Sequence, residues 1–382
     1  MTTMTTANKT TTTTTNLAGA DILAMAVAFP RYERTTEWFK RQQPDLVANE
    51  ASRSLAKLWQ PPPADAPGRI FAEAMAPYLN DPFRGTVARR VLGPGESSVT
   101  LGAQAARAAL AAAKMTASDV DLALVSALLP TPIGCGDAVY LARELGLRGA
   151  AFNLESNCAS ALLGLQTAAA FVRSGEYRRV LVVVSCTYSR NMDLADTLSW
   201  SSGDGAVAFL LGPCEPGQGI LGAHSVHTAD TIDALYVAIA PEPNDGKPFR
   251  LRTNKKGGAA LRDTAEPYLR RCTDGALKAA GLTRKEIDFL VVTTPTAWYA
   301  DFAARVLGFD KSQTIDLHPA YANIGPVLMP ANLFHAASAG KIRRGDRVLL
   351  YAIGSVSSAG AMVVRWGDVK LGPVPEPGVP EP

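Results

Sequence analysis

Aromatic residues make up only 7% of the 382 residues, histidine occurs four times, and basic residues exceed acidic ones by only three. So small a net charge gives no electrostatic reason to expect a nucleic-acid partner. No apolar run approaches the roughly 20 residues of a membrane-spanning helix, so the sequence predicts no membrane span. The five cysteines include no CxxC pair. This argues against a disulfide framework or a metal site, and favours mostly buried thiols in a reducing cytoplasm.

The chain is nevertheless rich in small and apolar residues, with 47% hydrophobic residues and 32 glycines. It is long enough for one large α/β domain or two fused smaller ones. The Thr-rich residues 1–16 predict a disordered tail, and the Pro-rich tail 371–382 cannot hold a helix or a central strand. Residues 31–84 mix charges, aromatics and prolines, which predicts helices and loops set aside from the core.

Two pairs of segments repeat at nearly one offset. Residues 275–296 repeat the helix–turn–strand pattern that leads into 115–132, with Asp288 lying 167 residues after Asp121. The segment that contains Arg347 likewise resembles the one that contains Arg179, at an offset of 168. We therefore predict an internal duplication into halves spanning 17–213 and 214–370. In such folds, sites form at the carboxyl ends of strands.

Cys158 is the candidate nucleophile. A short apolar segment, AAFNL at 150–154, predicts a strand, and the Ala-rich segment after Cys158 predicts a helix. A cysteine at a helix N-terminus meets free backbone N–H groups and the helix dipole, which favour the thiolate. The other four cysteines are expected to be structural.

Four segments together resemble the thiolase-superfamily condensing enzymes, in the branch similar to β-ketoacyl-ACP synthase III. They are GESSVTLGAQAARAAL from 95, FNLESNCASALLGL from 152, SSGDGAVAFLLGP from 201 and YANIGPVLMPANL from 321. The resemblance implies a duplicated five-layer αβαβα fold of the α/β class, no cofactor, and an acyl carrier protein or coenzyme A thioester as substrate. It also implies a homodimer in which strand 178–185 pairs across the twofold axis.

The resemblance also implies a Cys-His-Asn triad. Cys158 matches its nucleophile and Asn323 its asparagine. Thr293 stands where the histidine is expected, with Thr294 or Thr296 as alternatives if the alignment shifts. No histidine occurs between His227 and His318.

Further site residues are expected around this core. The backbone N–H groups of Cys158 and Ser355 match the oxyanion hole of the family. Two residues are candidates for the general base. One is His318, five residues before the asparagine. The other is Glu155, a carboxylate expected on a buried strand, where it needs a partner or a role.

Without the histidine, one donor to the enolate of decarboxylative condensation is missing, whereas acyl transfer needs only a thiolate, an oxyanion hole and an acceptor. The leading hypothesis is an acyltransferase of natural-product (polyketide or antibiotic) biosynthesis. It would move an acyl group through a Cys158 thioester to a small-molecule hydroxyl, amine or thiol without decarboxylation. The alternatives are a ketosynthase with an altered residue set and a non-catalytic partner subunit of a condensing complex.

Overall fold

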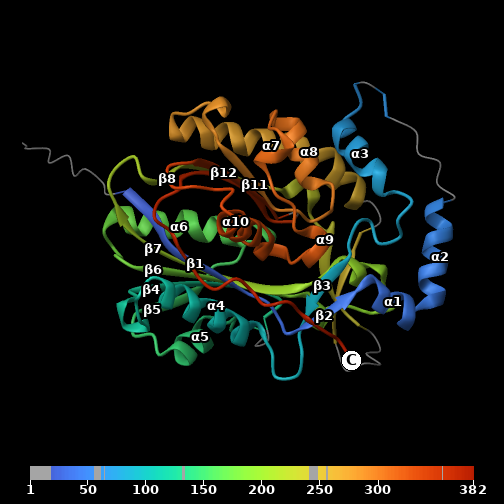
Figure 1. Cartoon of the computed structure of the whole chain (residues 1–382), viewed down its shortest axis with the longest axis horizontal. Coiled ribbons are helices and arrows are strands. Elements are labelled where there is room, and N and C mark those ends of the chain that lie inside the picture. Colours follow the sequence, from blue (N-terminus) through green and yellow to red (C-terminus); the bar gives the residue numbers. More distant parts are fainter. Residues whose placement is uncertain are drawn as a thin grey trace, which may run out of the picture.

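The computed structural model describes residues 19–55, 62–63, 65–130, 134–240, 248–254, 257–354 and 356–382. Two β-sheets lie between three layers of helices, which is the expected αβαβα arrangement (Figure 1). No helix within these ranges combines the length and the apolarity that crossing a bilayer requires. The predicted Thr-rich tail 1–16 and Ser355 lie outside the described residues.

The larger sheet has six strands in the order β14-β1-β7-β6-β4-β5. Its strands are β1 (Gly19–Ala28), β4 (Leu122–Leu128), β5 (Ala150–Asn153), β6 (Val180–Thr187), β7 (Asp204–Cys214) and β14 (Lys370–Leu371). The smaller sheet has four strands in the order β11-β12-β13-β8. They are β8 (Gly219–His227), β11 (Phe289–Val292), β12 (Arg347–Ile353) and β13 (Ser358–Arg365).

The two sheets repeat one pattern of pairing. In the first, β4 runs parallel to β6, while β7 is antiparallel to both β6 and β1. In the second, β11 runs parallel to β12, while β13 is antiparallel to both β12 and β8. The predicted duplicated fold is therefore confirmed. The division of the chain at residues 213 and 214 stays a prediction.

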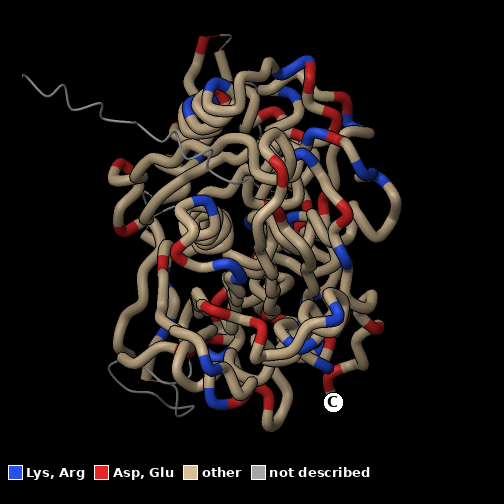
Figure 2. The backbone as a smooth tube through the Cα atoms, turned by 90° about the vertical axis from the view of Figure 1, so that its left-hand side faces the viewer, with Lys and Arg blue, Asp and Glu red and all other residues tan. Residues whose placement is uncertain are grey.

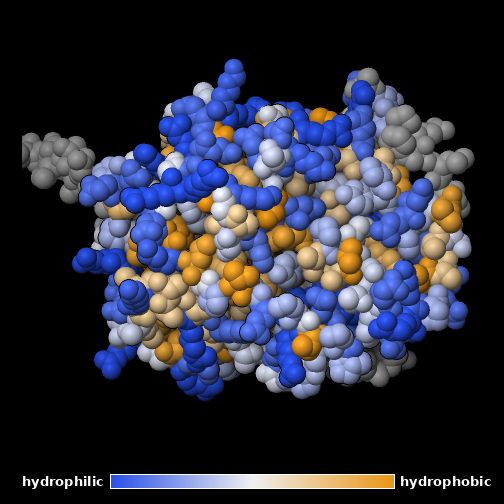
Figure 3. Space-filling view, viewed as in Figure 1, coloured by the Kyte–Doolittle hydropathy of each residue, from blue (hydrophilic) through white to orange (hydrophobic). Residues whose placement is uncertain are grey.

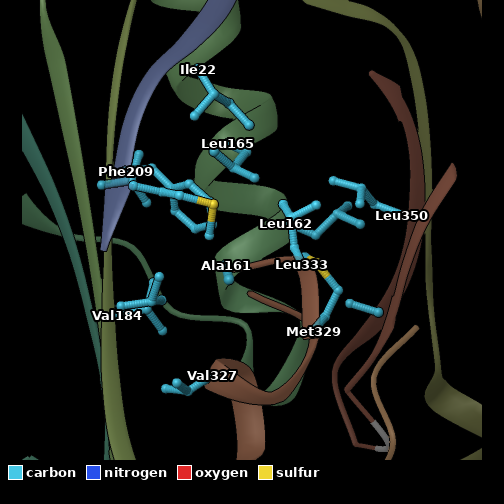
Figure 4. Close-up of a cluster of buried hydrophobic side chains, with 14 of the residues drawn as sticks. Ile22, Ala161, Leu162, Leu165, Val184, Phe209, Val327, Met329, Leu333 and Leu350 are labelled. Carbon is cyan, nitrogen blue, oxygen red and sulfur yellow. The ribbon is translucent and has the colours of Figure 1, made fainter. Parts of the chain in front are cut away.

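Three pairs of helices fill the layers. They are α4 (Ser98–Ala112) with α5 (Ala138–Leu145), α6 (Ser160–Ser174) with α10 (Leu328–Ser338), and α7 (Gly257–Ala280) with α8 (Tyr299–Leu307). The middle pair packs between the sheets, where Leu162 and Leu165 of α6 lie between Phe209 of β7 and Leu350 of β12 (Figure 4). All four of these side chains are fully buried, so this layer is the hydrophobic core that holds the two halves together.

Smaller elements surround the layers. They are β2 (Tyr32–Thr35), α1 (Thr36–Gln42), α2 (Pro44–Leu55), α3 (Arg69–Met75), β3 (Ala88–Val91), β9 (Leu235–Ile239), β10 (Phe249–Thr253), α9 (His318–Tyr321) and β15 (Val379–Pro380). Apart from Leu371, which ends β14, the Pro-rich C-terminal segment contributes only β15, at the edge of a sheet with the order β15-β2-β3. An edge position suits proline, which lacks the N–H that a central strand donates. An ion pair of 2.5 Å between Arg34 Nε and Glu381 Oε2 fixes this segment to β2.

The expected pairing of strand 178–185 across a twofold axis is wrong. This strand is β6, and it is hydrogen-bonded to β4 on one side and to β7 on the other. It therefore has no free edge. The edges of the sheet are the two-residue β14 and β5, whose Phe152 is 41% exposed.

The surface is mixed in charge and polarity. Basic and acidic residues are interspersed over the periphery in Figure 2. On the face drawn in Figure 3, apolar side chains form small areas separated by polar ones. The five cysteines are free, but only Cys186 and Cys272 are buried, so the prediction of mostly buried thiols is wrong.

Candidate active site

Cys158 lies at the predicted corner between a strand and a helix. Strand β5 ends at Asn153, Cys158 is in the 3₁₀ turn η3 (Asn157–Ala159), and α6 begins at Ser160. Asn157 adopts a φ of +50°, which turns the chain sharply before the nucleophile. The strand thus delivers Cys158 to the start of an apolar helix, as the sequence indicated.

Glu155 anchors this corner. Glu155 is exposed, not buried as expected, because it follows β5, an edge strand that is itself mostly exposed. The expected partners are nevertheless present. The carboxylate accepts hydrogen bonds from Ser126 Oγ (2.9 Å), Ser160 Oγ (2.7 Å), Ser156 N (3.1 Å) and Asn157 N (2.9 Å). Glu155 therefore ties the turn to β4 and to the start of α6, and its role as a base stays a hypothesis.

The Cys158 sulfur faces a small apolar pocket of about 100 Å³. The pocket is lined by Leu128, Leu129, Asn157, Cys158, Tyr188, Leu235, Tyr236, Val237, Leu251 and Val356. Burial raises the pKa of the Cys158 thiol to about 11, while a hydrogen bond from Tyr188 acts in the opposite direction. The Tyr188 hydroxyl oxygen lies 3.6 Å from the sulfur. An acyl chain attached to Cys158 would lie among aliphatic side chains.

Asn323 lies beside the same corner. The 3₁₀ turn η9 (Gly325–Val327), which begins two residues after it, packs against η3. The Asn323 side-chain Oδ1 accepts from Gly325 N at 2.9 Å. Its backbone N–H donates to Ser201 O (2.9 Å), and its carbonyl accepts from Gly203 N (3.0 Å). These bonds hold the segment of Asn323 against the turn that leads into β7.

Thr293 and His318 lie near the carboxyl end of β11. Thr293 is buried, and its hydroxyl has no hydrogen-bond partner among the described residues. His318 is also buried, with Nδ1 at 3.0 Å from Thr294 O and Nε2 at 2.9 Å from Thr86 Oγ1. A backbone carbonyl only accepts, so we assign the proton to Nδ1, and Nε2 accepts from the Thr86 hydroxyl. Burial lowers the pKa of His318 to about 4, so the ring is neutral at pH 7.

A histidine therefore stands next to the strand end where the family triad would place one. It comes from α9 rather than from the β11 segment, and both its ring nitrogens are engaged. The loss of a histidine from the site, and the use of His318 as a base, stay hypotheses. Together with Thr296, His318 lines a second cavity of about 310 Å³, which is also bounded by Arg84 and Trp200.

The predicted oxyanion donor Ser355 lies outside the described residues, but its neighbours approach the nucleophile. A Cβ added to Gly354 would lie 2.9 Å from Ser156 O and 3.1 Å from Ala159 N. Val356 lines the Cys158 pocket. Close backbone approach at Gly354 is compatible with an oxyanion hole at this loop, which stays a prediction.

Two features of the site were not predicted from the sequence. One is Tyr188, for which a signal existed: it directly follows the buried strand 180–187, at the edge where sites form. The other is the β9–β10 hairpin, which supplies Leu235, Val237 and Leu251 to the pocket. In the described part of the chain, no group of three His, Cys, Asp or Glu residues is arranged to hold a metal ion.

Comparisons with known proteins agree with this geometry. The family model of 3-oxoacyl-[acyl-carrier-protein] synthase III matches residues 152–228, and the model of its C-terminal part matches 277–366. β-Ketoacyl-[acyl-carrier-protein] synthase III of Brucella abortus (strain S19) is 33% identical over 288 residues, which cover 73% of this chain and 87% of the relative. The enzyme of the same name from Rhizobium meliloti (strain 1021) is 34% identical over 288 residues, which again cover 73% of this chain and 87% of the relative.

Solved structures share the fold. The synthase III of Aquifex aeolicus VF5 aligns with a TM-score of 0.74 at 21% identity, covering 91% of this chain and 100% of that one. The priming β-ketosynthase of the R1128 polyketide pathway aligns with a TM-score of 0.75 at 22% identity, covering 92% and 97%. Xanthomonas campestris OleA with bound lauric acid and lauroyl-CoA gives 0.73 at 18% identity, covering 92% and 100%. The chain belongs to the β-ketoacyl-[acyl-carrier-protein] synthase III family and is an enzyme of the thiolase-like transferases.

Proposed function

We propose that this enzyme is an acyltransferase of natural-product biosynthesis. It takes an acyl group from a carrier-protein or coenzyme A thioester onto Cys158 and passes it to a hydroxyl, amine or thiol of a small-molecule acceptor, without decarboxylation. The apolar lining of the Cys158 pocket suits an acyl chain. The bound lauroyl-CoA of OleA supports a coenzyme A thioester as one class of donor.

The observation that carries the proposal is the chemistry at the end of β11. Decarboxylation of a malonyl thioester places negative charge on a carbonyl oxygen, which needs preorganised donors. Thr293 offers a short neutral hydroxyl there, and the Nε2 of the neutral His318 already accepts from Thr86. Acyl transfer to and from Cys158 depends on the separate oxyanion hole, so it does not need this donor.

A condensing ketosynthase is the second candidate, and the relatives favour it. Those reported above at 33% and 34% identity carry the name β-ketoacyl synthase III. Such an enzyme would stabilise the enolate with Asn323 and another donor. A silent partner subunit is disfavoured, because a cysteine placed at the start of an apolar helix and facing its own pocket has no use there.

The proposal is tested by intact-protein mass spectrometry after incubation with a panel of acyl-CoA and acyl-carrier-protein thioesters. The enzyme should gain the mass of the acyl group, and Cys158→Ala should gain none. Cys272→Ala, which removes a buried thiol from α7, is the matched control and should load normally. Loading that persists in Cys158→Ala would show that another residue carries the acyl group.

Transfer is then followed by adding acceptors that carry a hydroxyl, an amine or a thiol to the loaded enzyme. Release of the acyl group as an ester, amide or thioester, with no carbon dioxide formed, is the expected result. If the loaded enzyme reacts only with malonyl thioesters and releases carbon dioxide, the ketosynthase alternative holds.

A further inference from the structure

Tyr188 places a phenolic oxygen 3.6 Å from the Cys158 sulfur. We propose that Tyr188 is a catalytic residue, whose hydroxyl donates a hydrogen bond to the Cys158 thiolate and so makes the nucleophile available in its apolar pocket. This inference rests on the proposed function in one respect, namely that Cys158 is the nucleophile. Tyr188 itself is fully enclosed, with 1% of its surface exposed, so its hydroxyl has no bulk water to bind.

The nucleophile needs such a donor because its surroundings disfavour a negative charge. Among the described residues that line the pocket, none carries a positive charge. Burial raises the pKa of Cys158, and the negative charge of Glu155 raises it further. The Tyr188 hydrogen bond opposes both effects. A donor fixed in a largely apolar site interacts more strongly with an anion than it would in water.

Tyr188 keeps its own proton while it acts. Burial raises the pKa of Tyr188 well above its ordinary value, so the phenol remains a donor when the thiol ionises. Among the described residues, the other titratable groups nearby are Cys186, Glu155 and Tyr236. Burial also raises the pKa of Cys186. Cys186 is buried as a neutral thiol, and Glu155 is held by its own four donors.

Hydrogen bonds hold the residues on both sides of Tyr188 in place. Before it, Thr187 Oγ1 donates to Leu129 O at 3.0 Å. After it, Ser189 N donates to Asp204 Oδ1 at 2.9 Å, and the Ser189 hydroxyl donates to the other carboxylate oxygen. These bonds hold the start of the 3₁₀ turn η4 (Tyr188–Asn191) at the end of β6. The phenol is therefore aimed at the sulfur before any substrate arrives, which is what a preorganised donor requires.

In the loading step, the thiolate attacks the carbonyl carbon of the donor thioester. A carbon–sulfur bond forms to Cys158 and the bond to the donor sulfur breaks. The proton that Cys158 gave up ends on the departing thiol, and Tyr188 is unchanged. A hydrogen bond to an ionised group corresponds to roughly a 10- to 100-fold larger thiolate population.

The test measures the thiol itself rather than acyl transfer. Iodoacetamide alkylation is followed at each cysteine by mass spectrometry across neutral and alkaline pH. Tyr188→Phe removes one oxygen and should slow alkylation of Cys158 about 10- to 100-fold near neutral pH, with its pH profile moved to higher pH. Alkylation of the exposed Cys135 is the internal standard and should be unchanged. Tyr351→Phe, which removes another buried phenol, should behave like the unmodified enzyme.

An unchanged Cys158 rate and pH profile in Tyr188→Phe would overturn the proposal. Should that variant fold poorly, 3-fluorotyrosine incorporated throughout the chain gives a second test. Its more acidic phenol is a stronger donor, so alkylation should accelerate at Cys158 and not at Cys135. If the alkylation of Cys158 depends on Tyr188 but the enzyme loads no acyl group, the proposed function is refuted and this inference stands. Loading that depends on Cys158 but not on Tyr188 would refute this inference alone.

Discussion

Substitution of Thr293 should distinguish the two candidate reactions. With threonine at this position, the enzyme should release little carbon dioxide from malonyl thioesters while it still transfers acyl groups. Thr293→His should raise decarboxylation by up to about 10²–10³-fold where the buried site admits the ring, since that is the usual contribution of one such donor. Carbon dioxide capture from labelled malonyl thioester measures the outcome.

Thr314→Val is the control for this experiment, because Thr314 is another buried threonine whose hydroxyl has no partner among the described residues. It should change neither reaction. Carbon dioxide release by the unmodified enzyme at the rate of its acyl transfer would instead identify a ketosynthase.

His318 should make stability depend on pH. Its pKa is about 4 in the folded enzyme against 6.5 for an ordinary histidine, so the unfolded chain binds more protons between these values. The neutral ring contributes to the free energy of unfolding above pH 6.5, and this contribution is lost as the pH falls toward 4. The loss between these two pH values is roughly 3 kcal/mol.

The measurement is the free energy of unfolding in urea at several pH values, for the enzyme and for His318→Gln. The difference between the two curves is the readout. Burial raises the pKa of Asp316 to about 6, so this carboxyl changes the free energy of unfolding with pH in the opposite direction. It does so in both proteins. His227→Gln, which removes an exposed histidine from β8, controls for the loss of a histidine as such. A difference curve that is flat with pH would mean that the ring is protonated equally in both states.

Among single residues, a position could be predicted from the sequence where the residue stands at the end of a strand or helix with a distinct hydrophobic pattern. Cys158 could be placed because hydrophobic patterns define β5 and α6 on its two sides. Tyr188 could not be paired with Cys158, because their contact depends on how β6 ends and how η4 turns toward α6. The burial of Glu155 was misjudged because β5 is a mostly exposed edge strand, which its apolar sequence does not reveal.

Among the elements, η9 brings the second half of the chain against the nucleophile, and Gly325 makes this approach possible. A Cβ at Gly325 would lie 3.1 Å from Cys186 Sγ and 3.2 Å from the Tyr188 hydroxyl, at a φ of +54°. Gly325→Ala should therefore both strain the backbone and displace Tyr188. We expect it to lower stability by more than the roughly 1–2 kcal/mol of the backbone strain alone, and to slow the alkylation of Cys158.

Gly340→Ala separates the two effects. Gly340 has a φ of +70°, but a Cβ there would meet nothing within 4 Å. Thermal unfolding should show the backbone cost in both variants, whereas only Gly325→Ala should change the reactivity of Cys158. Equal effects of the two substitutions on stability and on the thiol would mean that the contact with Tyr188 is unimportant.

At the scale of the whole molecule, the free edge of β5 supports the proposal of a homodimer. A strand that pairs with its own copy across a twofold axis does so antiparallel, and this would cover the edge and the exposed Phe152. Light scattering at micromolar concentration should give twice the chain mass of 40.3 kDa. Phe152→Lys should weaken the dimer at least about 10-fold, since it would place like charges near the axis.

Leu55→Lys replaces an exposed leucine of α2 and is the control, with no expected effect on the dimer. A well-behaved monomer would refute the proposal. The strand at the edge of the sheet was predicted wrongly from the sequence, since strand 178–185 was expected there and β5 occupies it. β6 is buried on both faces, which is typical of a central strand. β5 is four residues long and mostly exposed, and its apolar sequence predicts a strand without showing that this strand lies at an edge.

The pairing of β1 with β14 also has a consequence for synthesis on the ribosome. Residues Ala24 and Met25 pair with Lys370 and Leu371, nearly the whole chain away. At about 5–20 residues per second, this edge of the first strand waits roughly 20–70 s for its partner to be translated. After β7 has been translated, and until β14 follows it, the nascent larger sheet carries an open edge at β1 as well as at β5, and such an edge can pair with the wrong strand.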